Sequence, residues 1–165
     1  MRASSLVLAA LAAMGASACA TAPAPPPSGT SGPPPPVANY DWSFGAEGGR
    51  GGLVFGLQES DDVWIVMNCR QSSGRLDLSV ASPTASREVV LMAGAETGRF
   101  PARAESSEID EGYFLEAQAP SSAPVFQAFR REGWMRLGVS GAHAAPMVPH
   151  PASQSSIERF FAYCG

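Results

Sequence analysis

Residues 63–69 constrain the fold of this chain more than any other stretch, because Val-Trp-Ile-Val-Met-Asn-Cys is its most apolar run outside the N-terminus. In an extended strand, successive side chains point to opposite faces. One face of this run carries Val63, Ile65, Met67 and Cys69. The other face carries Trp64 and Val66, so both faces are largely apolar. A strand of this kind belongs in the middle of a fold, and we therefore predict a central β-strand here.

Alternating or mainly apolar segments predict seven further strands. In chain order they cover residues 40–44, 53–57, 75–80, 87–92, 99–104, 112–118 and 134–140. Short polar or glycine-containing turns separate them. This arrangement predicts a mainly β fold: an antiparallel β-sandwich or small barrel of seven to eight strands, with a short helix and a C-terminal helix.

The two helices are expected near the C-terminal end of the domain. The first runs over residues 123–131, with Ser122 as its N-cap and Gly133 just past its end. The second opens with Ser155-Ser156-Ile157-Glu158, a pattern typical of a capping box. Its apolar positions i, i+3, i+4 and i+7 are Ile157, Phe160, Phe161 and Cys164. This spacing places Cys164 on the helix face that is directed at the core.

The chain contains 3 cysteines, at positions 19, 69 and 164. A buried Cys164 can meet the strand that ends at Cys69, so we expect a disulfide between these two residues. The alternative is a pair of buried free thiols, which is disfavoured outside the reducing cytoplasm. Since an odd thiol is unusual in an exported protein, Cys19 then needs a role of its own.

Residues 1–18 are expected to be a signal peptide. Arg2 supplies a minimal positive charge, and residues 6–14 form an apolar segment. This segment is shorter than the roughly 20 residues of a membrane-spanning helix, but it matches the apolar region of a secretory signal. Residues 19–38 are rich in proline, which favours an extended polyproline II tether. Residues 39–165 then form a single globular domain.

The residues Ala16-Ser17-Ala18-Cys19 resemble the lipobox of bacterial lipoproteins, in which the cysteine is lipidated and becomes the mature N-terminus. The match departs from the usual pattern at Ala16, where Leu is commonest. The resemblance implies a lipid anchor with palmitate on Cys19. Because Ala20 and not Asp follows, it also implies the periplasmic face of the outer membrane. Ordinary signal-peptidase cleavage after Ala18 is the alternative, and it would give a soluble periplasmic or secreted protein.

The charge of the chain argues against nucleic acid as a partner. Its formal net charge is −4, and all 11 basic residues are arginines scattered along the sequence. Such a domain lacks the extended basic patch that nucleic acids or anionic lipids require. The glycine-rich residues 45–52 join two predicted strands, whereas a phosphate-binding loop leads from a strand into a helix. We therefore interpret them as a flexible hairpin loop.

Residues 143–150 contain both histidines of the chain, with a methionine between them. Imidazole and thioether groups suit copper, which makes His143, Met147 and His150 a candidate metal site. The alternative is a loop that simply packs over the core, since two prolines stiffen the segment and the sequence offers no further strong ligand.

Other candidate sites match their patterns only in part. Ser140 lies in Gly-Val-Ser-Gly-Ala, which lacks the final glycine of a hydrolase nucleophile elbow. The acidic residues gather in two turns, at 59–62 and 105–111, without the spacing of a calcium loop. We interpret both as solvated turns. A pair of carboxylates that cleaves a glycosidic bond is the alternative, because such a pair is defined by the distance between its two carboxyl groups in the folded protein and not by their spacing in the sequence. An exposed Trp42 or Trp134 would indicate a contact surface for a glycan or a protein.

The expected function is that of a non-catalytic, lipid-anchored module of the cell envelope. No cofactor is expected, and the partner would be an envelope protein or a cell-wall glycan. A periplasmic copper-binding protein is one alternative, and a small envelope hydrolase is the other. The leading interpretation depends on the leader, the tether and the paired cysteines, which describe where the domain works more closely than what it contacts.

Overall fold

The computed structural model describes residues 34–107, 111–138 and 145–165, which belong to one compact unit. The strands in these ranges are β1 (Tyr40–Glu47), β2 (Arg50–Leu57), β3 (Val63–Arg70), β4 (Arg75–Ser82), β5 (Glu88–Ala93), β6 (Glu96–Ser106), β7 (Tyr113–Pro120) and β8 (Arg136–Leu137). The helices are α1 (Pro124–Glu132) and α2 (Gln154–Cys164). No helix in the described part of the chain is long and apolar enough to cross a membrane.

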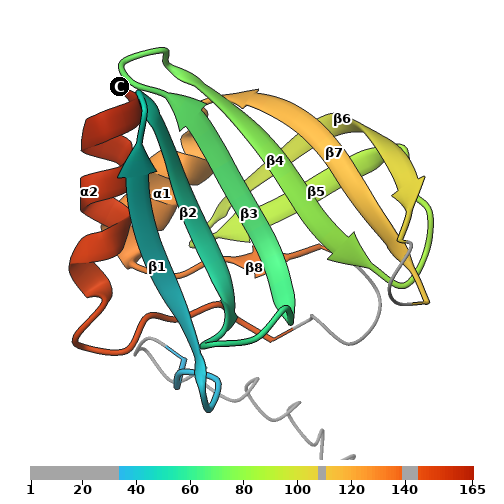
Figure 1. Ribbon diagram of the computed structural model, residues 1–165, viewed down its shortest axis with the longest axis horizontal. Helices are drawn as coiled ribbons and strands as arrows, with labels where there is room; N and C mark the ends of the chain where they lie inside the picture. Colours follow the sequence, from blue (N-terminus) through green and yellow to red (C-terminus); the bar gives the residue numbers. More distant parts are fainter. Residues whose placement is uncertain (1–33, 108–110, 139–144) are drawn as a thin grey trace, which may run out of the picture. The chain divides into compact units, whose positions relative to one another are not determined.

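The strands form one antiparallel sheet in the order β1-β2-β3-β4-β7-β6-β5-β8. Figure 1 shows that this sheet curls into a half-barrel with both helices on its inner side. Helix α2 packs on β1 and β2, and α1 packs on β5 and β6. Strand β3 pairs with β2 on one side and with β4 on the other, which confirms its predicted central position. The mainly β fold class is also confirmed.

Aromatic side chains fill the space between the sheet and the helices. Trp42 and Phe55 of the sheet and Phe129 of α1 are almost completely buried. The ring centroid of Trp42 lies 5.1 Å from that of Phe55 and 5.0 Å from that of Phe129. Phe161 of α2 lies 6.1 Å from Phe129 in an edge-on arrangement. Because such pairs stabilise beyond the area that they bury, the inner face of the sheet forms a continuous core.

The disulfide between Cys69 and Cys164 joins the end of β3 to the last turn of α2, as predicted. The two Cα atoms lie 5.7 Å apart, and both side chains are buried. Backbone hydrogen bonds next to the disulfide also join the β3–β4 turn to the end of α2. The N–H of Ser72 donates to the carbonyl of Tyr163, and the N–H of Gly74 donates to the carbonyl of Cys164, each at 2.9 Å. The β3–β4 turn thereby satisfies carbonyls that the end of a helix leaves free.

Helix α1 lies where it was predicted, but the predicted cap is wrong. Its N-cap is Ala123, no side chain caps it, and Ser122 is exposed. Pro124 opens the helix at a position where the missing N–H costs no hydrogen bond, so the first turn has one free donor fewer to satisfy. At the other end Gly133 has a left-handed φ of 76°, and its N–H donates to the carbonyl of Phe129.

Helix α2 begins at Gln154, so Ser155 lies within the helix and the predicted capping box is wrong. Its N-cap is Ser153, which forms no side-chain cap either. The Ser153 hydroxyl donates instead to the carboxylate of Asp41 in β1. A hydrogen bond to a distant strand has therefore replaced the local one that the sequence pattern indicated.

The glycine-rich residues 45–52 form a tight hairpin and not a flexible loop. Only Gly48 and Gly49 make the turn, with φ values of 57° and 78°, and their neighbours continue β1 and β2. Two successive residues with positive φ match the twist of paired strands, which is why glycine is favoured at both positions. The turn fixes the register of the hairpin, so that Glu47 lies opposite Arg50.

The last predicted strand, over residues 134–140, is shorter than expected. Strand β8 contains only Arg136 and Leu137, which pair with β5. The final two positions of the prediction lie outside the described ranges. Met135, just before β8, pairs with Met147 instead, so a second segment continues the sheet at this edge.

Candidate binding surface on the outer face of the sheet

The two faces of the sheet have different surroundings. The inner face packs against α1 and α2, whereas the outer face is turned away from both helices (Figure 1). Strand pairing arranges the outer side chains in rows across β2, β3, β4 and β7. One row consists of Val54, Val66, Ser79 and Glu116. The next row, toward the β1–β2 turn, consists of Gly52, Asn68, Asp77 and Gln118.

Hydrogen bonds between β4 and β7 fix the polar side chains of the outer face. Ser79 Oγ donates to Glu116 Oε1 at 2.5 Å. The side-chain amide of Gln118 accepts from Arg75 Nη2 at 2.7 Å and donates to Asp77 Oδ1 at 2.8 Å. A partner that bound here would meet side chains that are already ordered, which lowers the entropic cost of binding.

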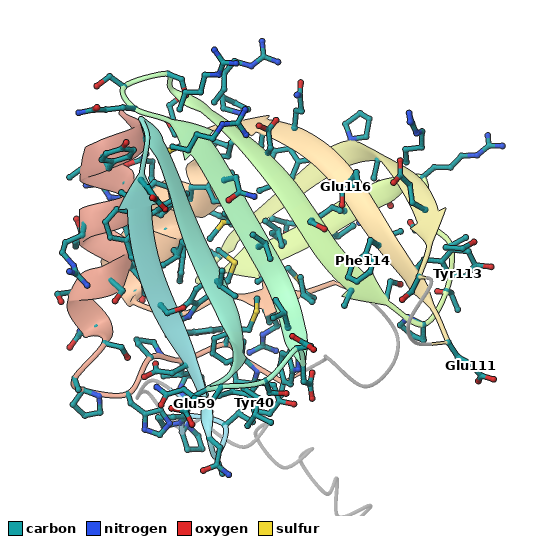
Figure 2. The ribbon with its side chains drawn as sticks, viewed as in Figure 1. Tyr40, Glu59, Glu111, Tyr113, Phe114 and Glu116 are labelled. Carbon is teal, nitrogen blue, oxygen red and sulfur yellow. A yellow bond between two sulfur atoms is a disulfide. The ribbon has the colours of Figure 1, made fainter. Side chains whose placement is uncertain are left out.

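Phe114 brings an aromatic ring to the same face. With 42% of its surface exposed, it is the large apolar side chain most open to solvent among the described residues. Figure 2 shows it on β7, two residues from Glu116. Its neighbours across the strands are Ala81 and Glu105. Since aromatic residues are enriched at protein interfaces, Phe114 marks this end of the outer face as a candidate contact point.

The outer face is hollowed over β6 and β7. A shallow groove of about 650 Å³ lies there. The charged and amide side chains that line it are Asp77, Arg103, Glu105, Glu116 and Gln118. Arg103 and Glu105 form an ion pair at 3.4 Å across the groove lining. A polar groove beside an exposed aromatic ring suits a hydroxyl-rich or peptide-like partner, which offers both hydrogen-bonding groups and a surface to stack.

Met147, one of the predicted copper ligands, links the two edges of the sheet. Its N–H donates to the carbonyl of Met135, beside edge strand β8, at 2.7 Å. Its carbonyl accepts from Trp42 Nε1, on edge strand β1, at 3.1 Å. The Met147 side chain is fully buried. This segment therefore spans the open side of the half-barrel and packs over the core.

The other predicted copper ligands are placed differently. His150 is half-buried, and its backbone N–H donates to the carboxylate of Asp41 at 3.0 Å. His143 lies outside the described residues. Within the described ranges, no group of three His, Cys, Asp or Glu residues is close enough to hold a metal ion. The copper site stays a prediction.

Asp41 is a buried carboxylate that the sequence analysis did not single out. Only 8% of its surface is exposed. It accepts hydrogen bonds from the backbone N–H groups of Trp42, at 2.8 Å, and His150, at 3.0 Å, and from the hydroxyl of Ser153. A buried carboxylate with this many donors is satisfied, so Asp41 holds the segment before α2 against β1. Its only sequence signal was that it is a charged residue within the first predicted strand, residues 40–44.

The acidic turns are exposed where the structure describes them. Figure 2 shows Glu59 near Tyr40 at one end of the sheet, and Glu111 at the end of β7 near Tyr113. Asp62 accepts a hydrogen bond from the hydroxyl of Tyr40. This bond, together with partial burial, raises the pKa of Tyr40 above its ordinary value of 10.0. Besides His143, the candidate residues that lie outside the described ranges are Cys19, Glu108, Asp110 and Ser140.

The three tryptophans are not exposed contact residues. Trp42 and Trp64 are buried, at 1% and 5% exposure. Trp134 is half-buried beneath the guanidinium of Arg136, whose Cζ lies 5.2 Å from the ring centroid. The aromatic contact residue of the outer face is therefore Phe114, which sequence analysis did not distinguish from the other residues of its strand.

No known family model matches this chain, and no curated protein or solved structure is significantly similar to it.

Proposed function

We propose that this protein is an exported, lipid-anchored module of the cell envelope that binds a partner through the outer face of its sheet. The lipid is attached to Cys19, and the partner is an envelope protein or a cell-wall glycan. The observation that carries the proposal is the contrast between an inner face filled by the chain's own helices and an outer face with ordered, accessible side chains.

The compartment is supported by the bond between Cys69 and Cys164. Disulfides persist in oxidising compartments and are rare in the cytosol, where thiols are kept reduced. With these two cysteines paired, Cys19 is the one left for lipidation. The lipobox-like residues before it and the proline-rich tether after it agree with this assignment.

The mode of binding is supported by the chemistry of the outer face. Phe114 offers an aromatic ring, and the groove beside it offers carboxylate, amide and guanidinium groups within one surface. Interfaces combine such an apolar centre with a polar rim. A sheet face of this kind can contact a partner without any change in the packing of the core.

The anchor is tested with Cys19→Ser in the native host. We expect this variant to lose palmitate labelling and to move from the membrane to the soluble fraction, because the thiol that carries the lipid is gone. Its disulfide is unaffected, so a non-reducing gel of the same samples controls for folding. Unchanged labelling of Cys19→Ser would refute the anchor.

The contact surface is tested by crosslinking in the intact envelope. A photoreactive amino acid at position 114 is expected to give a discrete adduct, whose partner is then identified by mass spectrometry. The matched control places the same group at Gln127, which is exposed on α1. Equal adducts from both positions, or none from 114, would contradict the outer face as the binding surface.

A further inference from the structure

Two arginines lie directly opposite each other at the upper end of the outer face. The register of β2 and β3 pairs Arg50 with Arg70, and both are exposed. Like charges at directly opposed strand positions repel each other. The pairing of these two positive charges is therefore unfavourable for the stability of the domain.

Neither Arg50 nor Arg70 forms an ion pair with another residue that the structure describes. The ion pairs among the described residues involve Arg99, Arg103, Arg130 and Arg131. Strand pairing places Glu47 opposite Arg50, yet no ion pair forms between them within the described part of the chain. The two positive charges are thus available to a negative group from outside, in a protein whose formal net charge is −4.

The arginines border a hollow of about 260 Å³. Its other lining residues are Asn68, Cys69 and Asp77. Gly52 leaves room beside the Asn68 side chain, because a Cβ at position 52 would lie only 3.0 Å from Asn68 Oδ1. The volume is below the roughly 300–1,000 Å³ of pockets that enclose a drug-sized ligand, so the hollow suits a single small group.

The lining selects the chemistry of that group. Guanidinium forks bind phosphate oxygens in pairs, and two of them match the double charge of a phosphate monoester. The carboxylate of Asp77 can accept hydrogen bonds from hydroxyl groups, and the amide of Asn68 can both accept from them and donate to them. Asp77 also repels a continuing run of phosphates, which disfavours a nucleic acid strand.

We propose that Arg50 and Arg70 form a binding site for a phosphate monoester carried on a polyhydroxylated ring, free or as a lipid headgroup. The arginines hold the phosphate, while Asn68 and Asp77 contact hydroxyls of the ring. The proposal depends neither on the lipid anchor nor on the contact surface around Phe114, so each can fail without the other.

The site is tested by titrating the full-length protein with glucose 6-phosphate at low salt. Binding is expected in the millimolar range or tighter, with glucose alone showing none. The double variant R50Q/R70Q is expected to lose at least about tenfold in affinity, because two charge-assisted contacts disappear. The double variant R87Q/R131Q is the matched control, since both arginines are exposed and their substitution removes the same two positive charges elsewhere on the protein.

Vesicles distinguish the source of the phosphate. Binding to phosphatidylinositol 4-phosphate in phosphatidylcholine vesicles, at least about tenfold tighter than glucose 6-phosphate, assigns a lipid headgroup. Binding of glucose 6-phosphate alone assigns a free sugar phosphate, and either result supports the site. The proposal is overturned if neither ligand binds, or if R87Q/R131Q loses as much affinity as R50Q/R70Q. The Tm of R50Q/R70Q should equal or exceed that of the wild type, because opposed like charges have been removed.

Discussion

The two faces of strand β3 show how the same backbone serves two purposes. On the inner face, Ile65 and Met67 are completely buried. On the outer face of the same strand, Asn68 and Arg70 are exposed. The inner residues are held by packing, which tolerates little change in volume. The outer residues contribute little to stability, so this face can carry opposed charges and an exposed ring without unfolding the domain.

The contrast predicts that substitutions on the inner face weaken the fold, whereas those on the outer face alter binding. A substitution on the outer face that unfolds the domain would contradict this prediction. A substitution of a buried inner residue that leaves the free energy of unfolding unchanged would contradict it as well. The comparison can be made with residues of the same type on the two faces.

The largest effect is expected at the disulfide. Replacing both Cys69 and Cys164 by Ser should lower the free energy of unfolding by about 4–5 kcal/mol, because the bond restrains a loop of many residues in the unfolded chain. The sequence separation it bridges is 95 residues. Urea unfolding monitored by tryptophan fluorescence measures the change. Asn68→Ser, on the outer face beside Cys69, should stay within about 0.5 kcal/mol of the wild type.

Phe129 and Phe114 provide the direct comparison between the faces. Phe129→Ala should lower the free energy of unfolding by about 3–5 kcal/mol, because the ring is fully buried and a cavity remains. Phe114→Ala should cost less than about 1 kcal/mol, since 42% of its surface is already exposed in the folded state and its loss leaves no enclosed cavity. Both are measured by urea unfolding at the same pH. Similar losses for the two variants would remove the distinction between inner and outer face.

Asp41 tests the edge of the sheet, between the two faces. Asp41→Ala should lower the free energy of unfolding by about 2 kcal/mol, because donors from Trp42 and His150 lose their buried acceptor. Asp61→Ala, in the exposed β2–β3 turn, is the matched control and should have little effect. Thermal unfolding followed by circular dichroism compares them, and equal Tm values for the two variants would contradict the structural role of Asp41.

The smallest effect is expected at Tyr40 and depends on pH. The hydrogen bond to Asp62, aided by burial, raises the pKa of Tyr40 in the folded protein above 10.0. The folded state therefore holds this proton more tightly than the unfolded chain does. Its contribution to stability is present below the unfolded pKa and is lost as pH rises through the folded one. Urea unfolding from pH 8 upward should show the wild type losing its advantage over Tyr40→Phe, and a pH-independent difference would contradict the coupling.

Much of the inner face could be predicted from sequence, because the buried residues of a strand or a helix recur at a regular spacing. Apolar side chains on both faces of residues 63–69 predicted the central position of β3, and the helical spacing of Ile157, Phe160 and Cys164 directed the last cysteine toward it. These patterns are local consequences of which side of an element meets the core. The helix caps failed for the opposite reason, since Ser153 binds Asp41, which is distant in sequence.

The candidate sites on the outer face could not be predicted, because binding residues do not recur at a regular spacing in the sequence as buried residues do. The pairing of Arg50 with Arg70 depends on the register of β2 and β3, which shifts at an irregularity next to Gly56. Single arginines scattered along a sequence give no sign of this. Phe114 likewise occurs in an ordinary alternating strand, and only the sheet shows that its ring is turned outward.

The order of the cysteines along the chain gives the disulfide a role in timing. Cys69 is synthesised within the third strand, whereas Cys164 follows all eight strands and closes the last helix. In a chain that emerges from its N-terminal end, Cys69 is therefore made well before Cys164, with the residues from β4 to α2 between them. The native bond can close only after these residues have been made, and a chain that lacks Cys164 leaves the Cys69 thiol open to exchange with other disulfides.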